Sequence, residues 1–70
     1  MKDHILHLTI NGEPRQIAAN TVTDLLEALG LNPQVTVVER NAIIVDRASY
    51  ATTALAEGDV LELVRLVGGG

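Results

Sequence analysis

Cysteine is absent from this chain, and aromatic residues are nearly absent. Without cysteine the chain can form no disulfide, no thiolate-bound metal site and no nucleophilic thiol. Tyr50 is the only aromatic residue, so the core must be built from Val, Leu, Ile and Ala. The length of 70 residues is enough for one domain. Aliphatic packing within a small domain must therefore supply most of the stability.

Basic residues are also few, with five Lys and Arg against nine Asp and Glu, for a net charge of −4. This excess of acids argues against nucleic acid as a partner, because phosphates would repel the chain. No apolar run approaches the roughly 20 residues that a membrane helix needs, and the first residues lack the pattern of a secretory signal. We therefore expect a cytoplasmic protein with no membrane partner, and the charge permits a partner with a basic surface.

The amino-terminal part reads as a β-hairpin. Residues 4–10 place Leu and Ile on alternate positions, which predicts a strand with one firmly apolar face. Asn11-Gly12 then gives the commonest signal for a tight hairpin turn. Residues 14–18 form the return strand, with Pro14 at its start, where a missing N–H matters least.

One helix follows the hairpin. Thr21 is a good N-cap, and Asp24 stands three residues later, as in a capping box with a shorter acid. Gly30 ends the helix as a left-handed cap, and Pro33 prevents its resumption. The apolar stripe of the helix consists of Val22, Leu25, Leu26 and Leu29. A helix this short is unstable alone, so its stripe must pack on a sheet.

The remaining elements are extended segments and turns. They are a strand at 35–40, a turn at Asn41-Ala42, a return at 43–45, an irregular segment at 46–56 with a short helical turn, a tight turn at 57–59 and a strand at 60–67. The first and last strands are the long apolar ones, so we expect them side by side and parallel at the centre. The sequence predicts an α+β fold, a mixed four- to five-stranded sheet packed on one helix.

The glycine run Gly68-Gly69-Gly70 follows the last strand. Glycines lose much backbone entropy on ordering and bury nothing, so this run stabilises no fold. It does give a thin arm that ends in a carboxylate without a neighbouring Cβ. We therefore expect a folded domain at residues 1–67, a flexible tail at 68–70, and a reacting atom at the carboxylate of Gly70. A glycine run can also be a cloning remnant.

Five segments carry a resemblance to a known family: residues 8–13, 21–26, 38–41, 57–59 and 64–70. The order of elements with a terminal Gly-Gly resembles the ubiquitin-like β-grasp proteins. Within that group the chain resembles the ThiS family of thiamine-biosynthesis sulfur carriers over essentially its whole length. The tail has three glycines where two define the family motif, and the extra residue lengthens the arm.

The resemblance implies a protein co-substrate rather than an enzyme, with no catalytic residue, no metal site and no bound cofactor. An E1-like partner would adenylate Gly70 with ATP and magnesium, and a persulfide sulfur would displace AMP to leave a thiocarboxylate. Thiazole synthase would receive the sulfur. Gly68 and Gly69 would let the tail enter a narrow active site. Val64, Arg65 and Leu66 are the candidate partner contacts.

Other functions stay open on the sequence. The chain could carry sulfur for molybdopterin or cysteine synthesis, act as a ubiquitin-like modifier, or serve as a non-covalent interaction domain. Several side chains also have purely structural interpretations: Val64 and Leu66 packed under the helix or a loop, Arg40 and Arg65 solvated, Glu39 and Asp59 at the surface, and Tyr50 as the anchor of a small cluster with its hydroxyl in solvent. An enzyme is disfavoured, because the sequence offers no nucleophile–base pair, phosphate loop or metal cluster.

Overall fold

A computed structural model of the chain describes residues 4–66. The predicted tail, Gly68, Gly69 and Gly70, lies outside the described residues, and so does the predicted domain boundary after residue 67. Within the described part, no helix is both long enough and apolar enough to cross a membrane.

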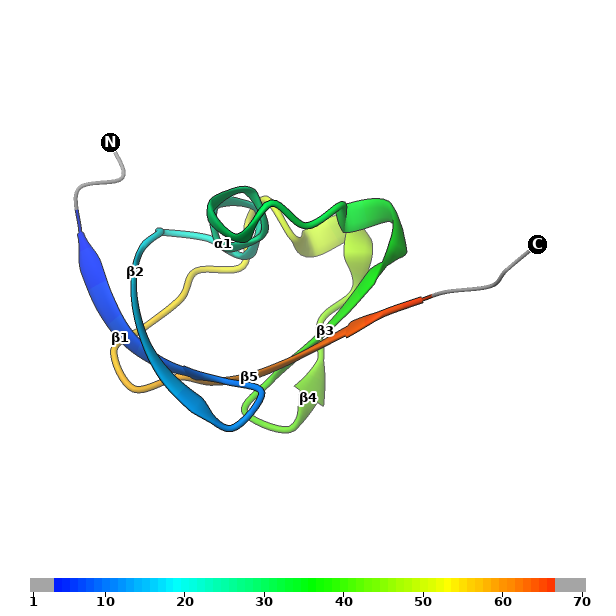
Figure 1. Cartoon of the computed structure of the whole chain (residues 1–70). Coiled ribbons are helices and arrows are strands. Elements are labelled where there is room, and N and C mark those ends of the chain that lie inside the picture. Colours follow the sequence, from blue (N-terminus) through cyan, green and yellow to red (C-terminus); the bar gives the residue numbers. More distant parts are fainter. Residues whose placement is uncertain (1–3, 67–70) are drawn as a thin grey trace.

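One mixed sheet of five strands curls around a single helix (Figure 1). The strands are β1 (Ile5–Ile10), β2 (Glu13–Ala18), β3 (Thr36–Arg40), β4 (Ile43–Ile44) and β5 (Val60–Arg65). Their order across the sheet is β2-β1-β5-β3-β4. β1 and β5 are parallel neighbours, while β1–β2, β3–β5 and β3–β4 are antiparallel. The predicted central pair and its parallel direction are confirmed.

Helix α1 (Val22–Leu29) begins and ends as the sequence predicts. The Thr21 side chain accepts a hydrogen bond from the Asp24 N–H at 3.2 Å, and the Asp24 carboxylate accepts one from the Thr21 N–H at 3.2 Å. Gly30 closes the helix with φ of 71°, a left-handed conformation that costs glycine little. The capping box and the glycine cap are therefore confirmed.

The core lies between α1 and the inner face of the sheet. Strand alternation supplies six of its twelve buried residues and α1 supplies three, while the remaining three come from the β2–α1 connection and the loop before β5. The buried members are Leu6, Leu8, Ile10, Ile17, Ala19, Val22, Leu25, Leu26, Val38, Tyr50, Leu55 and Leu61. Because nearly all are aliphatic, stability depends on the area that α1 and the inner face of the sheet bury against each other and on close packing.

Two tight turns use residues with positive φ. Asn11 and Gly12 join β1 to β2 with φ of 50° and 83°, and Asn41 and Ala42 join β3 to β4 with φ of 52° and 69°. Left-handed geometry at both central positions matches the twist of hairpin strands. Both turns lie where the sequence predicts them.

Element ends differ slightly from the expectation. Val35 belongs to a short 3₁₀ helix, Pro33–Val35, whose first turn is capped by the Asn32 side chain, so β3 begins one residue late. β4 has two residues rather than three. The helical turn expected in the segment 46–56 is present as a 3₁₀ helix at Arg47–Ser49.

The prediction that the Tyr50 hydroxyl lies in solvent is wrong, whereas the ring does anchor a packed cluster as predicted. Its side chain is 4% exposed, and its hydroxyl donates a hydrogen bond of 2.7 Å to the carbonyl oxygen of Thr36. The ring fills the core beside α1, while the hydroxyl ties the loop before β5 to the start of β3. Because this hydroxyl finds a partner, burial of the ring does not carry the cost of an unsatisfied polar group.

Candidate functional site: the outer face of β5

β5 presents two different faces. Leu61 points toward α1 and is fully buried, and Leu63 packs against the same core. Val60 and Val64 fall on alternate positions and point away from α1, with exposures of 44% and 56%. The sequence left open whether Val64 and Leu66 pack under another element, and the structure leaves both in solvent. Both faces of this central strand are thus apolar, yet only one is covered.

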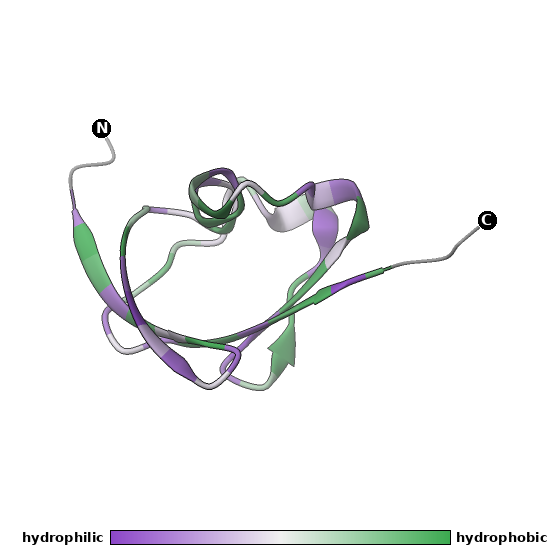
Figure 2. Ribbon diagram, viewed as in Figure 1, coloured by the Kyte–Doolittle hydropathy of each residue, from purple (hydrophilic) through white to green (hydrophobic). Residues whose placement is uncertain are grey.

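The exposed apolar side chains on this side gather around β5. We define the outer face by Val60, Val64 and Leu66 of β5 and its continuation, Val37 and Glu39 of β3, Glu62 of β5, and Ile44 of β4. The ribbon coloured by hydropathy shows that β4 is apolar and that β5 contains apolar stretches (Figure 2). Exposed large apolar side chains that lie on one face are typical of a protein-binding surface.

Two carboxylates lie opposite each other within this face. Glu39 of β3 pairs directly with Glu62 of β5, and Ile44 lies on the other side of Glu39. Like charges in directly opposite positions destabilise a sheet. Neither carboxylate forms an ion pair with any residue between 4 and 66. A cation on a partner would relieve this repulsion, so the outer face suits an apolar partner surface that carries a basic group.

Asp59 fixes the start of β5. Its side chain is 6% exposed and accepts hydrogen bonds from Arg40 Nε at 2.7 Å, Asn41 Nδ2 at 3.0 Å and the Ala56 N–H at 2.8 Å. Burial alone would raise the pKa of Asp59, but the hydrogen bonds from Asn41, Ala56 and Arg40 outweigh it and hold the pKa below its ordinary value. The interpretations of Asp59 as a surface acid and Arg40 as a solvated base are wrong.

Two asparagines extend the pairing of β5. Asn41 Oδ1 accepts a hydrogen bond of 2.9 Å from the Val60 N–H. Asn11 Oδ1 accepts one of 2.8 Å from the Leu63 N–H, and its Nδ2 donates one of 3.2 Å to the Leu63 carbonyl. Each asparagine side chain thus makes hydrogen bonds to the main chain of β5 that a neighbouring strand would otherwise make. The sequence marked both as turn residues but gave no sign of these long-range contacts.

The predicted contact residues do not share one face. Val64 and Leu66 lie on the outer side, whereas Arg65 lies on the side of Leu63 and α1. Gly68, Gly69 and Gly70 lie outside the described residues. Within residues 4–66, no group of three or more metal-binding side chains comes together.

Comparison with known proteins identifies the family. The model of the ThiS family matches residues 8–70. The sulfur carrier protein ThiS of Bacillus subtilis is 40% identical over 50 residues, which cover 71% of this chain and 76% of that protein. A crystal structure of the thiamine biosynthesis protein ThiS from Geobacter metallireducens superposes with a TM-score of 0.79 at 32% identity, and covers 93% of this chain and all of that one.

Larger proteins also match. A thiazole synthase of Paramagnetospirillum magneticum is 47% identical, and one of Magnetococcus marinus is 39% identical, each over 66 residues or 93% of this chain. The chain spans about a fifth of the length of these two relatives, at 20% of each. The fold, the family model and the Bacillus relative agree, and the chain belongs to the ThiS family of ubiquitin-like β-grasp proteins.

Proposed function

We propose that this domain is a sulfur carrier of thiamine biosynthesis and that the carboxylate of Gly70 takes the sulfur. The observation that carries the proposal is the family match, which runs from residue 8 through Gly70 and so includes the whole glycine run. The Bacillus subtilis relative, named a sulfur carrier protein, supports it.

The chemistry begins with activation, because a carboxylate is a poor electrophile. An E1-like adenylating enzyme attaches the Gly70 carboxylate to the α-phosphate of magnesium-bound ATP, and pyrophosphate leaves. The terminal sulfur of a persulfide then attacks the acyl carbon and AMP leaves. If an acyl disulfide forms, a thiol reduces its S–S bond, and the thiocarboxylate remains on Gly70. The chain acts as a co-substrate and supplies no acid, base or metal to these steps.

Thiazole synthase is the proposed receiver of the sulfur. Two proteins that bear this name contain a segment that aligns with nearly the whole of this chain. A carrier segment within the same polypeptide would raise the effective concentration of the sulfur donor near the synthase. For a separate carrier, a docking surface has to supply that proximity.

The outer face is the proposed docking surface. Val64 and Leu66 are more than half exposed, and they lie four and two residues before the start of the predicted tail at Gly68. Burial of these side chains against a partner would release water and direct the glycines toward the partner's active site. A basic side chain on the partner would at the same time lie against Glu39 and Glu62.

ATP–pyrophosphate exchange tests the activation step. We expect an E1-like enzyme that adenylates the Bacillus subtilis carrier to catalyse exchange that depends on this chain. A matched chain with Gly70 converted to a C-terminal amide should support none, because it lacks the carboxylate. Absence of exchange with the folded, unmodified chain, while the Bacillus carrier is active in parallel, would overturn the proposal.

A further inference from the structure

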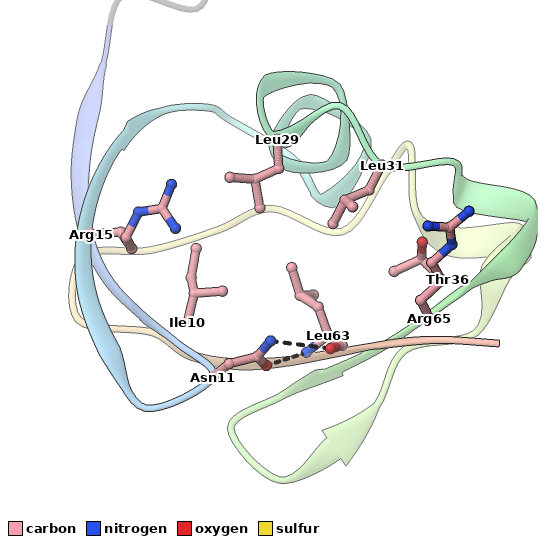
Figure 3. Close-up of a pocket in the computed structure, with 8 residues that line it drawn as sticks. All are labelled: Ile10, Asn11, Arg15, Leu29, Leu31, Thr36, Leu63 and Arg65. Carbon is pink, nitrogen blue, oxygen red and sulfur yellow. Dashed lines mark hydrogen bonds between the residues drawn. The ribbon is translucent and has the colours of Figure 1, made fainter. Parts of the chain in front are cut away.

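A second surface lies on the opposite side of the sheet from the outer face. A cavity of about 370 Å³ opens beyond the carboxyl end of α1, between that end, the β1–β2 hairpin and β5. Part of its wall is apolar and is lined by the side chains of Ile10, Leu29, Leu31 and Leu63 (Figure 3). An apolar hollow of this size at the surface can take an aliphatic side chain, and its burial there would be favourable.

Two arginines lie on opposite sides of this cavity (Figure 3). Arg15 projects from β2 and Arg65 from β5, and both side chains are exposed. Neither forms an ion pair with any residue between 4 and 66, whereas Arg40 binds Asp59 and Arg47 donates to the Pro33 carbonyl. Arg15 and Arg65 thus lie at one cavity, each without an ion-pair partner among residues 4–66, in a chain of net charge −4. This arrangement is complementary to carboxylates.

β5 also has an open edge beside the cavity. Opposed residues of an antiparallel pair alternate between hydrogen-bonded and non-hydrogen-bonded positions. The Leu66 N–H donates to the Val35 carbonyl at 2.7 Å, so Leu66 and Val35 form a hydrogen-bonded pair. The next pair, Arg65 and Thr36, is therefore a non-hydrogen-bonded pair. The Thr36 carbonyl is bonded to Tyr50 instead, which agrees with this alternation. The main-chain N–H and C=O of Arg65 therefore point away from β3.

No strand lies on that side of Arg65 in the described part of the chain. β1 pairs with β5 only through Thr9–Val60 and Ile10–Leu61, and the chain then turns at Asn11. The Asn11 side chain satisfies the main chain of Leu63, and the ladder ends there. An open edge of this kind can accept the main chain of another extended segment.

We propose that this cavity and edge bind an extended acidic segment of a partner protein. The segment pairs with the main chain of Arg65, inserts one aliphatic side chain between Leu29, Leu31 and Leu63, and places acids near Arg15 and Arg65. Residues two positions apart share a face of a strand, so the favoured pattern is acid–x–aliphatic–x–acid. The occupant is a peptide rather than a small anion, because only a peptide uses the open main-chain groups. This surface is independent of the proposed function, which uses the outer face and Gly70.

Amide chemical shifts of the isotope-labelled chain test this proposal. The probe is a blocked peptide containing Asp-Thr-Val-Thr-Asp, and its matched control contains Asn-Thr-Val-Thr-Asn. We expect the acidic peptide to shift the amides of Leu31, Leu63 and Arg65, and to bind more weakly at high salt. The control peptide should bind about tenfold more weakly, because both ion pairs are lost.

Variants sharpen the test. Arg15→Ala and Arg65→Ala should each weaken the acidic peptide by about three- to fivefold, and the double variant by about tenfold, as expected for exposed ion pairs. Arg47→Ala removes one positive charge from an exposed residue that does not line the cavity, and should leave the affinity unchanged. The spectra of the free variants show directly whether each is folded.

Three results would overturn the proposal. The acidic peptide could leave the spectrum of the folded chain unchanged, or shift only the amides of the outer face. Alternatively, acetate or inorganic phosphate could shift the same cavity amides as strongly as the peptide does, which would make the cavity a site for small anions. None of these results depends on adenylation, so they do not bear on the sulfur-carrier proposal.

Discussion

Asp59 organises the turn that leads into β5. It is one of the few buried polar side chains of the described residues, and it accepts hydrogen bonds from a guanidinium, an amide side chain and a main-chain N–H. These donors come from the end of β3 and from the loop before β5. A carboxylate with such partners stabilises the fold more in its ionised form than in its protonated form.

Asp59→Asn should lower the free energy of unfolding at neutral pH by about 1–3 kcal/mol, because an amide cannot accept from all three donors. The folded-state pKa of Asp59 is depressed, so its contribution is complete above the unfolded-state value of about 3.9 and is lost as the pH falls through the folded value. Urea unfolding of both proteins between neutral and strongly acidic pH checks this. The difference between them should shrink below about pH 4; a difference that is constant with pH would contradict the role of the charge.

Asn11→Ala should destabilise the chain more than Asn11→Gly. Both variants lose the two hydrogen bonds to Leu63, and alanine must also adopt a φ of 50°, which costs about 1–2 kcal/mol more than glycine. Thermal unfolding measures the difference. Hydrogen exchange at the Leu63 amide should be faster in both variants than in the unchanged chain. Equal stability of the two variants would show that the turn conformation carries no strain.

At the scale of the element, β5 has a structural side and an exposed side. Leu61 and Leu63 face the core, and Val60 and Val64 face solvent. Substitution on the exposed side should therefore change partner binding without changing the fold.

Val64→Lys should reduce the rate of partner-dependent adenylation by about fivefold to tenfold, equivalent to a binding loss of about 1–1.4 kcal/mol. Its unfolding temperature should stay close to that of the unchanged chain, because the side chain is 56% exposed. Ile5→Lys is the matched control, since Ile5 is 58% exposed at the start of β1, where β1 does not pair with β5, and it is not one of the residues that define the outer face. Equal losses in both variants would mean that the outer face is not the docking surface.

Signals that act over a few residues were predictable from the sequence. The Asn11-Gly12 turn, the Thr21 cap and the Gly30 cap each depend on neighbours within one turn of chain. The contacts of Asp59 with Arg40 and Asn41 span 18 or 19 residues, and they arise only when the β3–β4 turn meets the loop before β5. No local pattern carries that information.

The candidate site, too, was only partly predictable from the sequence. Strand alternation alone predicts that Val64 and Arg65 point to opposite faces. The prediction from the sequence nevertheless treated them as one set of partner contacts. The cavity beside Arg65 was not foreseen, because it depends on how the β1–β2 hairpin curls around the end of α1. The roles of Gly68, Gly69 and Gly70 stay predictions, since these residues lie outside the described part.

At the scale of the whole molecule, folding and the proposed reaction involve different parts of the chain. The core, the caps of α1 and the hydrogen bonds of Asp59 lie within residues 4–66, and the proposed reaction takes place at the glycine run. Changes in the glycine run should therefore alter the reaction while the stability stays constant.

Gly69→Val should lower the rate of adenylation by about a hundredfold, because a branched side chain beside Gly70 would displace the carboxylate within a narrow active site. The unfolding temperature should stay unchanged. Ala51→Val is a control, since it adds similar bulk at an exposed position outside the outer face and the glycine run. Adenylation of the Gly69→Val chain at the unchanged rate would show that the active site does not require a thin tail.

The sulfur-carrier function is tested by the intact mass of the chain after incubation with ATP, magnesium, an E1-like adenylating enzyme and a persulfide donor. We expect a mass gain equal to the exchange of one oxygen for one sulfur. Fragmentation should place that exchange on Gly70, and the Gly70 amide should gain nothing. An unchanged mass for the folded chain, with an enzyme and donor that convert the Bacillus subtilis carrier in parallel, would contradict the sulfur-carrier function.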